Sequence, residues 1–159
     1  MHLTRETWTD ADAADTHLAL LPVGSTEQHG PHAPLGTDVH TAAAVAAAGA
    51  DRYGGPVVVA PAVPVGIAEE HRRFAGTLWT SESTFRDYVR DVVGSLASHG
   101  WDRVVVVNGH GGNIAALKEV TARIVRHDDA YAVPFTWFDE VGEHTSDMGH
   151  AGPLETSVL

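Results

Sequence analysis

Residues Asp102–Asn108, with the sequence DRVVVVN, carry four consecutive valines and form the clearest strand signal in the chain. Short runs of β-branched residues are typical of strands that are buried on both faces. The glycine-rich turn Gly109–Asn113 (GHGGN) follows directly, and a helical pattern then runs from about Asn113 to His127. A strand, a tight turn and a helix in this order predict one unit of a parallel α/β sheet.

The same alternation of strand and helix patterns continues on both sides of this unit. The expected strands are His17–Val23, Pro56–Ala60 and Tyr131–Trp137. One expected helix is Val39–Asp51, capped by Thr37 or Asp38 and stopped by Gly54-Gly55. A second expected helix runs from Ser81 or Ser83 to His99. We therefore predict an α/β fold with three layers, α/β/α, around a largely parallel central sheet. The length of 159 residues favours a single domain over residues 1–159.

The composition excludes several classes of function. The formal net charge is −11 and Lys118 is the only lysine, so binding to nucleic acid is not expected. No apolar run reaches the ~18 residues of a membrane span, and the N-terminus lacks a secretory pattern, so we expect a cytoplasmic protein without membrane contact. The acidic, lysine-poor composition is typical of halophilic proteins. Ordinary solubility from a high-GC coding bias is the alternative interpretation.

The first cluster of chemically competent residues follows the first expected strand. Glu27 and His29 are two residues apart, so in an extended segment both side chains point the same way, and Asp38 at the helix start can turn toward them. The chain has no cysteine, so a metal must be bound by carboxylate and imidazole groups such as these. A polar surface loop that ends in a helix cap is the alternative.

The second cluster is the turn Gly109–Asn113, where His110 lies just beyond the strand that ends at Asn108. The carboxyl ends of parallel strands are where α/β enzymes bind ligands. A glycine-rich turn that opens a helix also suits a phosphate. The turn lacks the lysine of a phosphate-binding loop, which favours a metal over a nucleotide.

The third cluster lies near the end of the chain, where His150 and Glu155 flank a tight turn into an expected helix. Favourable interaction of Glu155 with the helix dipole is the simpler interpretation of this carboxylate. His32 and His71 are candidates for substrate contact or idle loop residues, and Trp137 for a pocket wall or a core residue. The remaining histidines are interpreted as surface residues: His2, His17, His40, His99, His127 and His144.

Taken together, these segments resemble the signature motifs of the creatininase family. The segments are PVGSTEQHGPHAPLGTD from Pro22, EHRRFAGT from Glu70, VNGHGGN from Val107 and HAGPLETS from His150. The third of the four lacks the glutamate that creatininase has two residues after the histidine; Gly112 stands there instead. The resemblance runs from about Leu20 to Leu159, which falls in the first turn of an expected helix. It therefore implies a creatininase-like domain that lacks its C-terminal part.

The resemblance implies two divalent metal ions (Zn, Mn or Fe). Their ligands would be Glu27, His29, a bridging Asp38, His110 and, in place of a residue at Gly112, Glu155. It implies His150 and Glu155 as the catalytic residues, with His150 as the proton donor to the leaving group. A hydroxide bridging the two ions would attack the amide carbonyl.

The resemblance also implies an amidohydrolase that acts on a small-molecule amide with a non-peptide or cyclic C–N bond, and a homo-oligomer, commonly a hexamer. Within the family, the composition favours a formamide hydrolase (a deformylase) of archaeal riboflavin and deazaflavin synthesis. The alternatives are a creatinine amidohydrolase and a peptidase that trims the mycofactocin precursor. A hypothesis of another class is a non-catalytic module that binds a metal or a phosphate.

Overall fold

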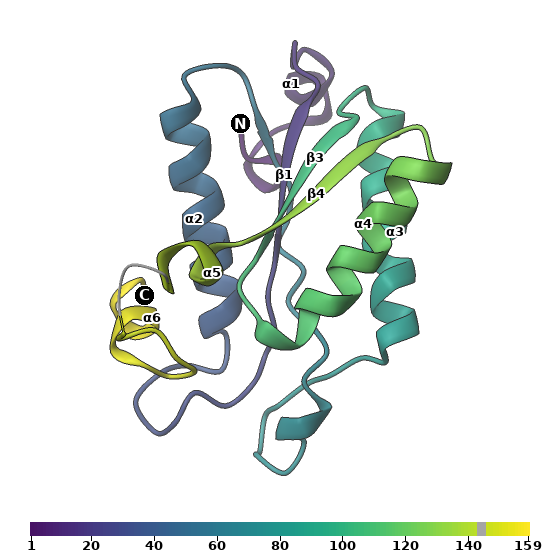
Figure 1. Ribbon diagram of the computed structural model, residues 1–159. Coiled ribbons are helices and arrows are strands. Elements are labelled where there is room, and N and C mark those ends of the chain that lie inside the picture. The colour runs from purple at the N-terminus through teal and green to yellow at the C-terminus, as the bar shows by residue number, and fades with distance from the viewer. Residues whose placement is uncertain (143–145) are drawn as a thin grey trace.

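Four parallel strands form the sheet at the centre of the computed structural model, which describes residues 1–142 and 146–159 (Figure 1). Their order across the sheet is β2-β1-β3-β4. The strands are β1 (Leu18–Val23), β2 (Val58–Val59), β3 (Arg103–Asn108) and β4 (Tyr131–Thr136). Because Val23 pairs with Asn108, the two central strands end side by side at the same edge of the sheet.

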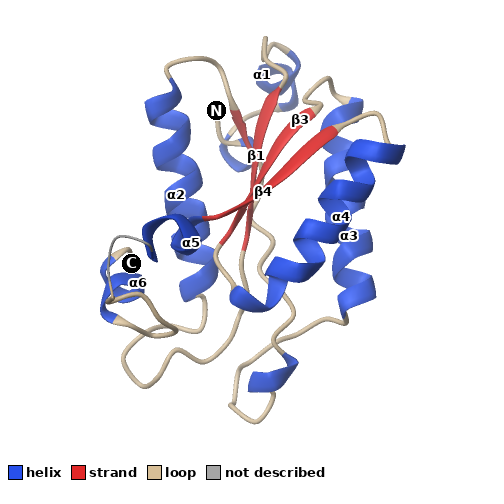
Figure 2. Ribbon diagram, viewed as in Figure 1, coloured by secondary structure: helices blue, strands red, loops and turns tan. Residues whose placement is uncertain are grey.

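Helices form a layer on each face of this sheet (Figure 2). Helix α2 (Thr37–Tyr53) covers one face, whereas α3 (Glu82–Ser98) and α4 (Ile114–His127) pack together on the other. The short elements are η1 (Leu3–Arg5), α1 (Trp8–Asp12), η2 (Glu69–His71), η3 (Gly111–Asn113), α5 (Trp137–Gly142) and α6 (Pro153–Ser157). The predicted three-layer α/β/α fold with a parallel sheet is confirmed. Within the described residues, no helix has both the length and the apolarity that a membrane crossing requires.

The valine run of β3 supplies side chains to both faces of the sheet. Val104 and Val106 belong to the larger core cluster, with Phe85 of α3 and Leu117 of α4. Val107 points the opposite way, into the smaller cluster beneath α2. Because successive side chains of a strand alternate between faces, a strand covered on both sides needs apolar residues at every position.

Glycines at the ends of the two central strands allow α2 to approach the sheet edge closely. A Cβ added to Gly24 would lie 2.5 Å from the backbone nitrogen of Val39, and one added to Gly109 would lie 2.2 Å from the carbonyl oxygen of Asp38. Any larger residue would push the first turn of α2 away from the strand ends. These two glycines therefore place Asp38 at the edge where the motif residues gather.

Each of the four strands differs from the sequence prediction at a boundary, and β1 and β3 each begin one residue later than expected. The strand expected over residues 56–60 shortens to β2, because Pro56 has no N–H for the ladder and only two residues pair with β1. The strand expected to reach Trp137 ends at Thr136, and Trp137 begins α5. The predicted cap of α3 is confirmed, since the Ser81 side chain accepts a hydrogen bond from the backbone of Thr84.

The prediction that Thr37 or Asp38 caps α2 is wrong. The N-cap residue is Gly36, which makes no side-chain cap, and both polar residues lie within the first turn. The hydroxyl of Thr37 donates to the carbonyl oxygen of Pro34 over 2.7 Å. Asp38 directs its carboxylate toward His29 instead of its own helix. The Asp38 carboxylate thus contacts the cluster at the sheet edge and does not cap α2.

Candidate metal centre

The three sequence clusters meet at the carboxyl edge of the sheet. Glu27 and His29 lie on the loop after β1, Asp38 on the first turn of α2, and His110 on the turn after β3. Five of the six predicted site residues are buried: Glu27, His29, Asp38, His110 and Glu155. His150 is exposed at the rim.

Asp38 lies between the two buried imidazoles. Its Oδ1 is 3.0 Å from Nε2 of His29, and its Oδ2 is 3.1 Å from Nδ1 of His110. Glu27 approaches His110 from the other side, with Oε2 at 3.3 Å from the same Nδ1. Glu27, Asp38 and His110 each therefore offer a ligand atom within 4.8 Å of the others.

Glu155 joins the opposite side of this cluster. Its Oε2 lies 3.6 Å from Nε2 of His29 and accepts a hydrogen bond of 2.6 Å from the backbone N–H of Ala151. Glu155, His29 and His150 form a second group whose ligand atoms lie within 4.8 Å of one another, and Glu27, His71 and His150 form a third. His110 of the first group and His29 of the second face the two oxygens of Asp38, an arrangement that suits a carboxylate shared by two ions.

Backbone and amide hydrogen bonds hold the imidazoles in place. Nε2 of His110 lies 2.8 Å from the carbonyl oxygen of Ile67, which leaves Nδ1 to face the carboxylates. The side chain of Asn108 accepts from the backbone N–H of His110 and donates to its carbonyl oxygen. Nδ1 of His29 lies 3.2 Å from the carbonyl oxygen of Glu27, so that Nε2 faces the cluster. Such outer hydrogen bonds are typical of metal-binding histidines.

The electrostatics of the cluster favour a cation. Burial opposes protonation of His29 and His110, but hydrogen bonds and charges from the carboxylates outweigh it and raise the pKa of each to about 10. Burial also acts against the charged form of Asp38, yet its two imidazole neighbours lower its pKa. Without metal, two imidazolium groups thus provide the positive charge that the carboxylates need.

The donor atoms fit divalent metal ions. Oε2 of Glu27 and Oδ2 of Asp38 are buried and make no hydrogen bond, although both lie near His110. Buried carboxylate oxygens without a partner are costly, and a bound cation would satisfy both. Imidazole nitrogen and carboxylate oxygen are ligands that Zn, Mn and Fe accept.

Gly112 has no room for a side chain. A Cβ there would lie 2.2 Å from the carbonyl oxygen of Ile67 and 2.5 Å from Nε2 of His110. Glu155 on α6 lies near His29, with Oε2 at 3.6 Å from Nε2; its role as the replacement ligand stays a prediction.

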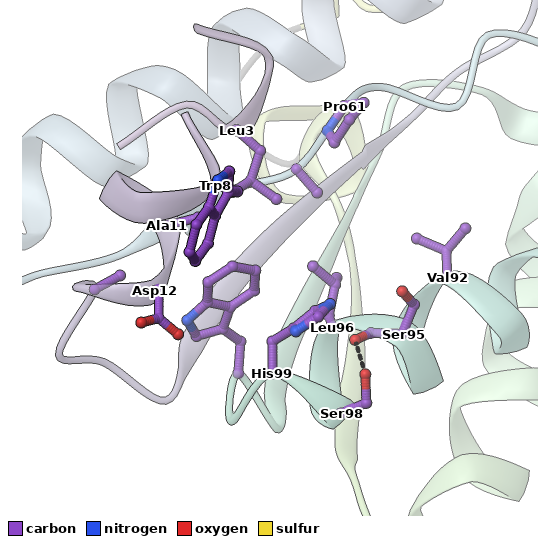
Figure 3. Close-up of a pocket in the computed structure, with 13 residues that line it drawn as sticks. Leu3, Trp8, Ala11, Asp12, Pro61, Val92, Ser95, Leu96, Ser98 and His99 are labelled. Carbon is purple, nitrogen blue, oxygen red and sulfur yellow. Dashed lines mark hydrogen bonds between the residues drawn. The ribbon is translucent and has the colours of Figure 1, made fainter. Parts of the chain in front are cut away.

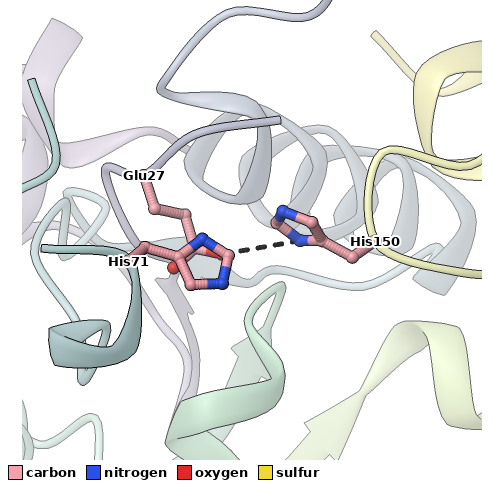
Figure 4. A group of neighbouring side chains, drawn as sticks. All are labelled: Glu27, His71 and His150. Atoms are coloured by element: carbon pink, nitrogen blue, oxygen red, sulfur yellow. Dashed lines mark ion pairs between the residues drawn. The ribbon is translucent and has the colours of Figure 1, made fainter. Parts of the chain in front are cut away.

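The rim of the cluster is formed by His150, His71 and Gln28. Figure 4 shows His71 and His150 beside the carboxylate of Glu27, with Nδ1 of His150 at 3.6 Å from Oε1 of Glu27. His71 meets His150 edge to face, with ring centres 4.9 Å apart. Nε2 of His150 lies 2.8 Å from the carbonyl oxygen and 3.0 Å from the side-chain nitrogen of Gln28. The sequence does not predict a role for Gln28, because an amide side chain between two candidate ligands has no pattern that indicates a function.

The cluster lines a pocket of about 290 Å³. Its charged side chains besides histidine are the acidic Glu27, Asp38, Glu70 and Glu155, and within the described residues neither lysine nor arginine lines it. Four carboxylates, with neither lysine nor arginine among the described lining residues, argue against the phosphate-binding interpretation of the glycine turn.

A larger cavity of about 730 Å³ lies away from this cluster, between the N-terminal segment and the end of α3 (Figure 3). Trp8, Leu96 and Trp101 contribute to its wall, and its ionisable side chains are Asp12 and His99. Among the described residues, the candidate groups of three metal-ligating side chains all lie at the sheet edge instead. The smaller pocket is therefore the candidate site.

The other candidates divide between rim, core and surface. His32 is exposed, and its Nε2 lies 3.2 Å from the carbonyl oxygen of Ala151 in the loop that carries His150. Trp137 is 3% exposed and does not line the pocket, whereas its neighbour Phe138 does. Of the histidines interpreted as surface residues, His2 is half-buried. Four others are exposed: His17, His40, His99 and His127. His144 lies outside the described residues.

Comparison with known proteins places this geometry in context. The family model described as "Creatininase: Creatinine amidohydrolase" matches residues 4–159. A mycofactocin precursor peptide peptidase of Mycolicibacterium smegmatis is 43% identical over 148 residues, which cover 89% of this chain and 56% of that protein. A creatinine amidohydrolase of Pseudomonas putida is 29% identical over 179 residues, which cover 96% of this chain and 68% of that protein. The chain thus spans a little over half the length of the peptidase.

Solved structures agree with the family match. A crystal structure of creatinine amidohydrolase superposes with a TM-score of 0.74 at 28% identity, over 98% of this chain and 70% of that one. A structure titled "Creatininase Mn" superposes with a TM-score of 0.74 at 27% identity over the same shares. Other creatininase structures include a mutant described as the Zn-Zn type.

Proposed function

The chain belongs to the creatininase family, and from that premise we propose that it is a metal-dependent hydrolase that cleaves a carbon–nitrogen amide bond. The main support for the proposal is the position of the Asp38 carboxylate between two imidazoles. Its two oxygens lie 3.0 and 3.1 Å from nitrogens of two different buried imidazoles. A carboxylate in this position can bridge two ions, which is the arrangement of two-metal hydrolases.

The ligands divide into two sets that share Asp38. Glu27, Asp38 and His110 would hold one divalent ion, and His29, Asp38 and Glu155 the other. Zinc, manganese and iron suit these donors. Two such ions lower the pKa of water toward neutrality and polarise an amide carbonyl, which is the chemistry that this reaction needs.

His150 is the residue proposed to deliver a proton to the departing amine. The carbonyl oxygen of Gln28 engages its Nε2, so Nδ1 remains available toward the pocket. Nδ1 lies 3.6 Å from Oε1 of Glu27. An exposed histidine at the rim can also exchange its proton with solvent after each turnover.

For the substrate, we favour a precursor peptide over creatinine. The mycofactocin precursor peptide peptidase is 43% identical to the chain and the creatinine amidohydrolase 29%. The formamide-hydrolase hypothesis rests on composition alone and takes second place. The halophilic character and the homo-oligomer, a hexamer by resemblance, also stay predictions.

The deciding experiment combines metal analysis with a substrate panel. The purified protein is loaded with zinc or manganese, and metal per chain is measured by elemental analysis. It is then incubated with a mycofactocin precursor peptide, creatinine or a formamidopyrimidine, and products are identified by mass spectrometry. His150→Asn, which keeps a polar side chain at the rim, is the matched variant.

We expect about two ions per chain, cleavage of the precursor peptide, and a rate lowered roughly 10²- to 10⁴-fold in the His150 variant, the usual contribution of a general acid. A chain that binds two ions but hydrolyses none of the substrates would favour the non-catalytic metal-binding module. Unchanged turnover in His150→Asn would remove His150 from the mechanism.

A further inference from the structure

The side-chain amide of Gln28 has a defined orientation. Its Oε1 accepts a hydrogen bond of 2.9 Å from the backbone N–H of Gly30. A backbone N–H can only donate, so this contact distinguishes the amide oxygen from the nitrogen. The tight turn that allows it requires the positive φ of 66° at Gly30. The amide nitrogen is therefore directed to the other side, toward the rim of the pocket.

That nitrogen determines which atom of His71 carries a proton. Nε2 of Gln28 lies 3.1 Å from Nδ1 of His71. An amide nitrogen donates and does not accept, so Nδ1 of His71 must be the acceptor. In a neutral imidazole, the hydrogen then resides on Nε2. Gln28 thus holds His71 as an N–H donor.

Among the described residues that line the pocket, no side chain carries a permanent positive charge. The pocket that His71 lines contains four acidic side chains, and neither lysine nor arginine lines it among the described residues. A substrate oxygen that the proposed metal ions do not bind would meet repulsion from the acidic lining of the pocket unless a donor faced it. The edge-to-face contact with His150 keeps the plane of the His71 ring in place.

We propose that Gln28 is a positioning residue that fixes the tautomer of His71, so that Nε2 of His71 donates a hydrogen bond to an oxygen of the substrate. The inference rests on the proposed function of the same site. It concerns how the substrate is oriented: His71, which also forms a candidate ligand group with Glu27 and His150, is assigned to the substrate.

Two substitutions separate this role from simple packing. Gln28→Glu keeps the size and shape of the side chain but replaces the donor by a carboxylate, which demands a proton on Nδ1 of His71. Gln28→Met keeps the length and removes the hydrogen bond. Both variants keep the bond between His150 and the backbone oxygen of Gln28, and both lose the contact of 3.0 Å between the Gln28 side-chain nitrogen and Nε2 of His150.

The test is the protonation pattern of His71 by nuclear magnetic resonance. The protein is labelled with ¹⁵N-histidine and loaded with zinc, which is diamagnetic, and long-range ¹H–¹⁵N correlations are recorded. A His71→Asn variant identifies the signals of His71. We expect a bare Nδ1 and a protonated Nε2 in the unmodified protein, a protonated Nδ1 in Gln28→Glu, and a mixture of tautomers in Gln28→Met.

A protonated Nδ1 in the unmodified protein, or the same pattern in all three proteins, would overturn the proposal. If Gln28→Glu does not fold, the Gln28→Met spectrum decides. Zinc per chain, measured on the same samples, keeps the two proposals apart: a chain that binds no zinc refutes the hydrolase, while the His71 signals still report on Gln28. In kinetics, we expect KM for the cleaved substrate to rise about 10- to 100-fold in Gln28→Glu, the effect of losing one buried hydrogen bond.

Discussion

Replacing Glu155 by glutamine should remove one metal ion and leave the other. Glu155 approaches His29 and takes no part in the group formed by Glu27, Asp38 and His110. Asp38 faces both imidazoles, so Asp38→Asn should impair both ions. Elemental analysis should therefore give about two ions per chain in the unmodified protein, about one in Glu155→Gln and fewer than one in Asp38→Asn.

The stability of the loaded protein provides an independent magnitude. An ion present at a hundred times its Kd stabilises the folded state by about 2.7 kcal/mol. For a domain of this size, 1 kcal/mol shifts Tm by about 2 to 4 °C, so each ion should raise Tm by roughly 5 to 11 °C. Loading should thus raise Tm by about 10 to 20 °C in the unmodified protein and by half as much in Glu155→Gln.

The assay is differential scanning calorimetry of metal-free and zinc-loaded samples. Glu70→Gln is the matched control, because Glu70 lines the same pocket but is exposed and belongs to neither ligand group. A Glu155→Gln protein that retains two ions and the full rise in Tm would refute the assignment of Glu155. A Glu70→Gln protein that loses an ion would show that pocket charge in general, and not ligand geometry, governs binding.

Three further predictions concern the same cluster. The pKa values of about 10 at His29 and His110 mean that both rings are protonated in the metal-free chain at pH 7.5, so zinc binding should release about two protons. Calorimetric titrations in buffers of different ionisation enthalpy would measure the released protons. A binding enthalpy that does not depend on the buffer would contradict the pKa values. Because the pKa values of His29 and His110 are raised above 6.5, the two protonated rings stabilise the metal-free chain fully below pH 6.5, and this stabilisation is lost as the pH rises through 10. Urea unfolding should show the free energy of unfolding falling over this pH range. The fall should be smaller in His29→Gln. Gly112→Ala should destabilise the protein by about 1 to 3 kcal/mol, because its Cβ would overlap the carbonyl oxygen of Ile67. Gly111→Ala is the control, because a Cβ at Gly111 would have nothing within 4 Å. Equal free energies of unfolding for the two variants would argue against the close approach.

Much of the fold could be predicted because local patterns and tertiary demands agree. The valines of β3 predict a strand covered on both faces, and the structure places helices on both faces. The boundary at Trp137 was predicted wrongly, because an apolar residue after a strand fits the continuing strand and the first turn of a helix equally well. The cap of α2 was predicted wrongly for another reason: the polar groups at its start have partners outside the helix that the sequence does not reveal.

The kinds of atoms that the site can contain, and the edge at which they gather, follow from the amino-acid sequence. Without cysteine, the available ligands are carboxylates and imidazoles, and strands that end in motif residues bring them to one edge of a parallel sheet. The pairing of these groups could be read only from the three-dimensional arrangement of the loops. Gln28 and His150 are 122 positions apart and yet in hydrogen-bond contact, and Glu155 completes the group around His29. Such contacts depend on the paths of loops across the sheet edge, and no local preference of the chain specifies those paths.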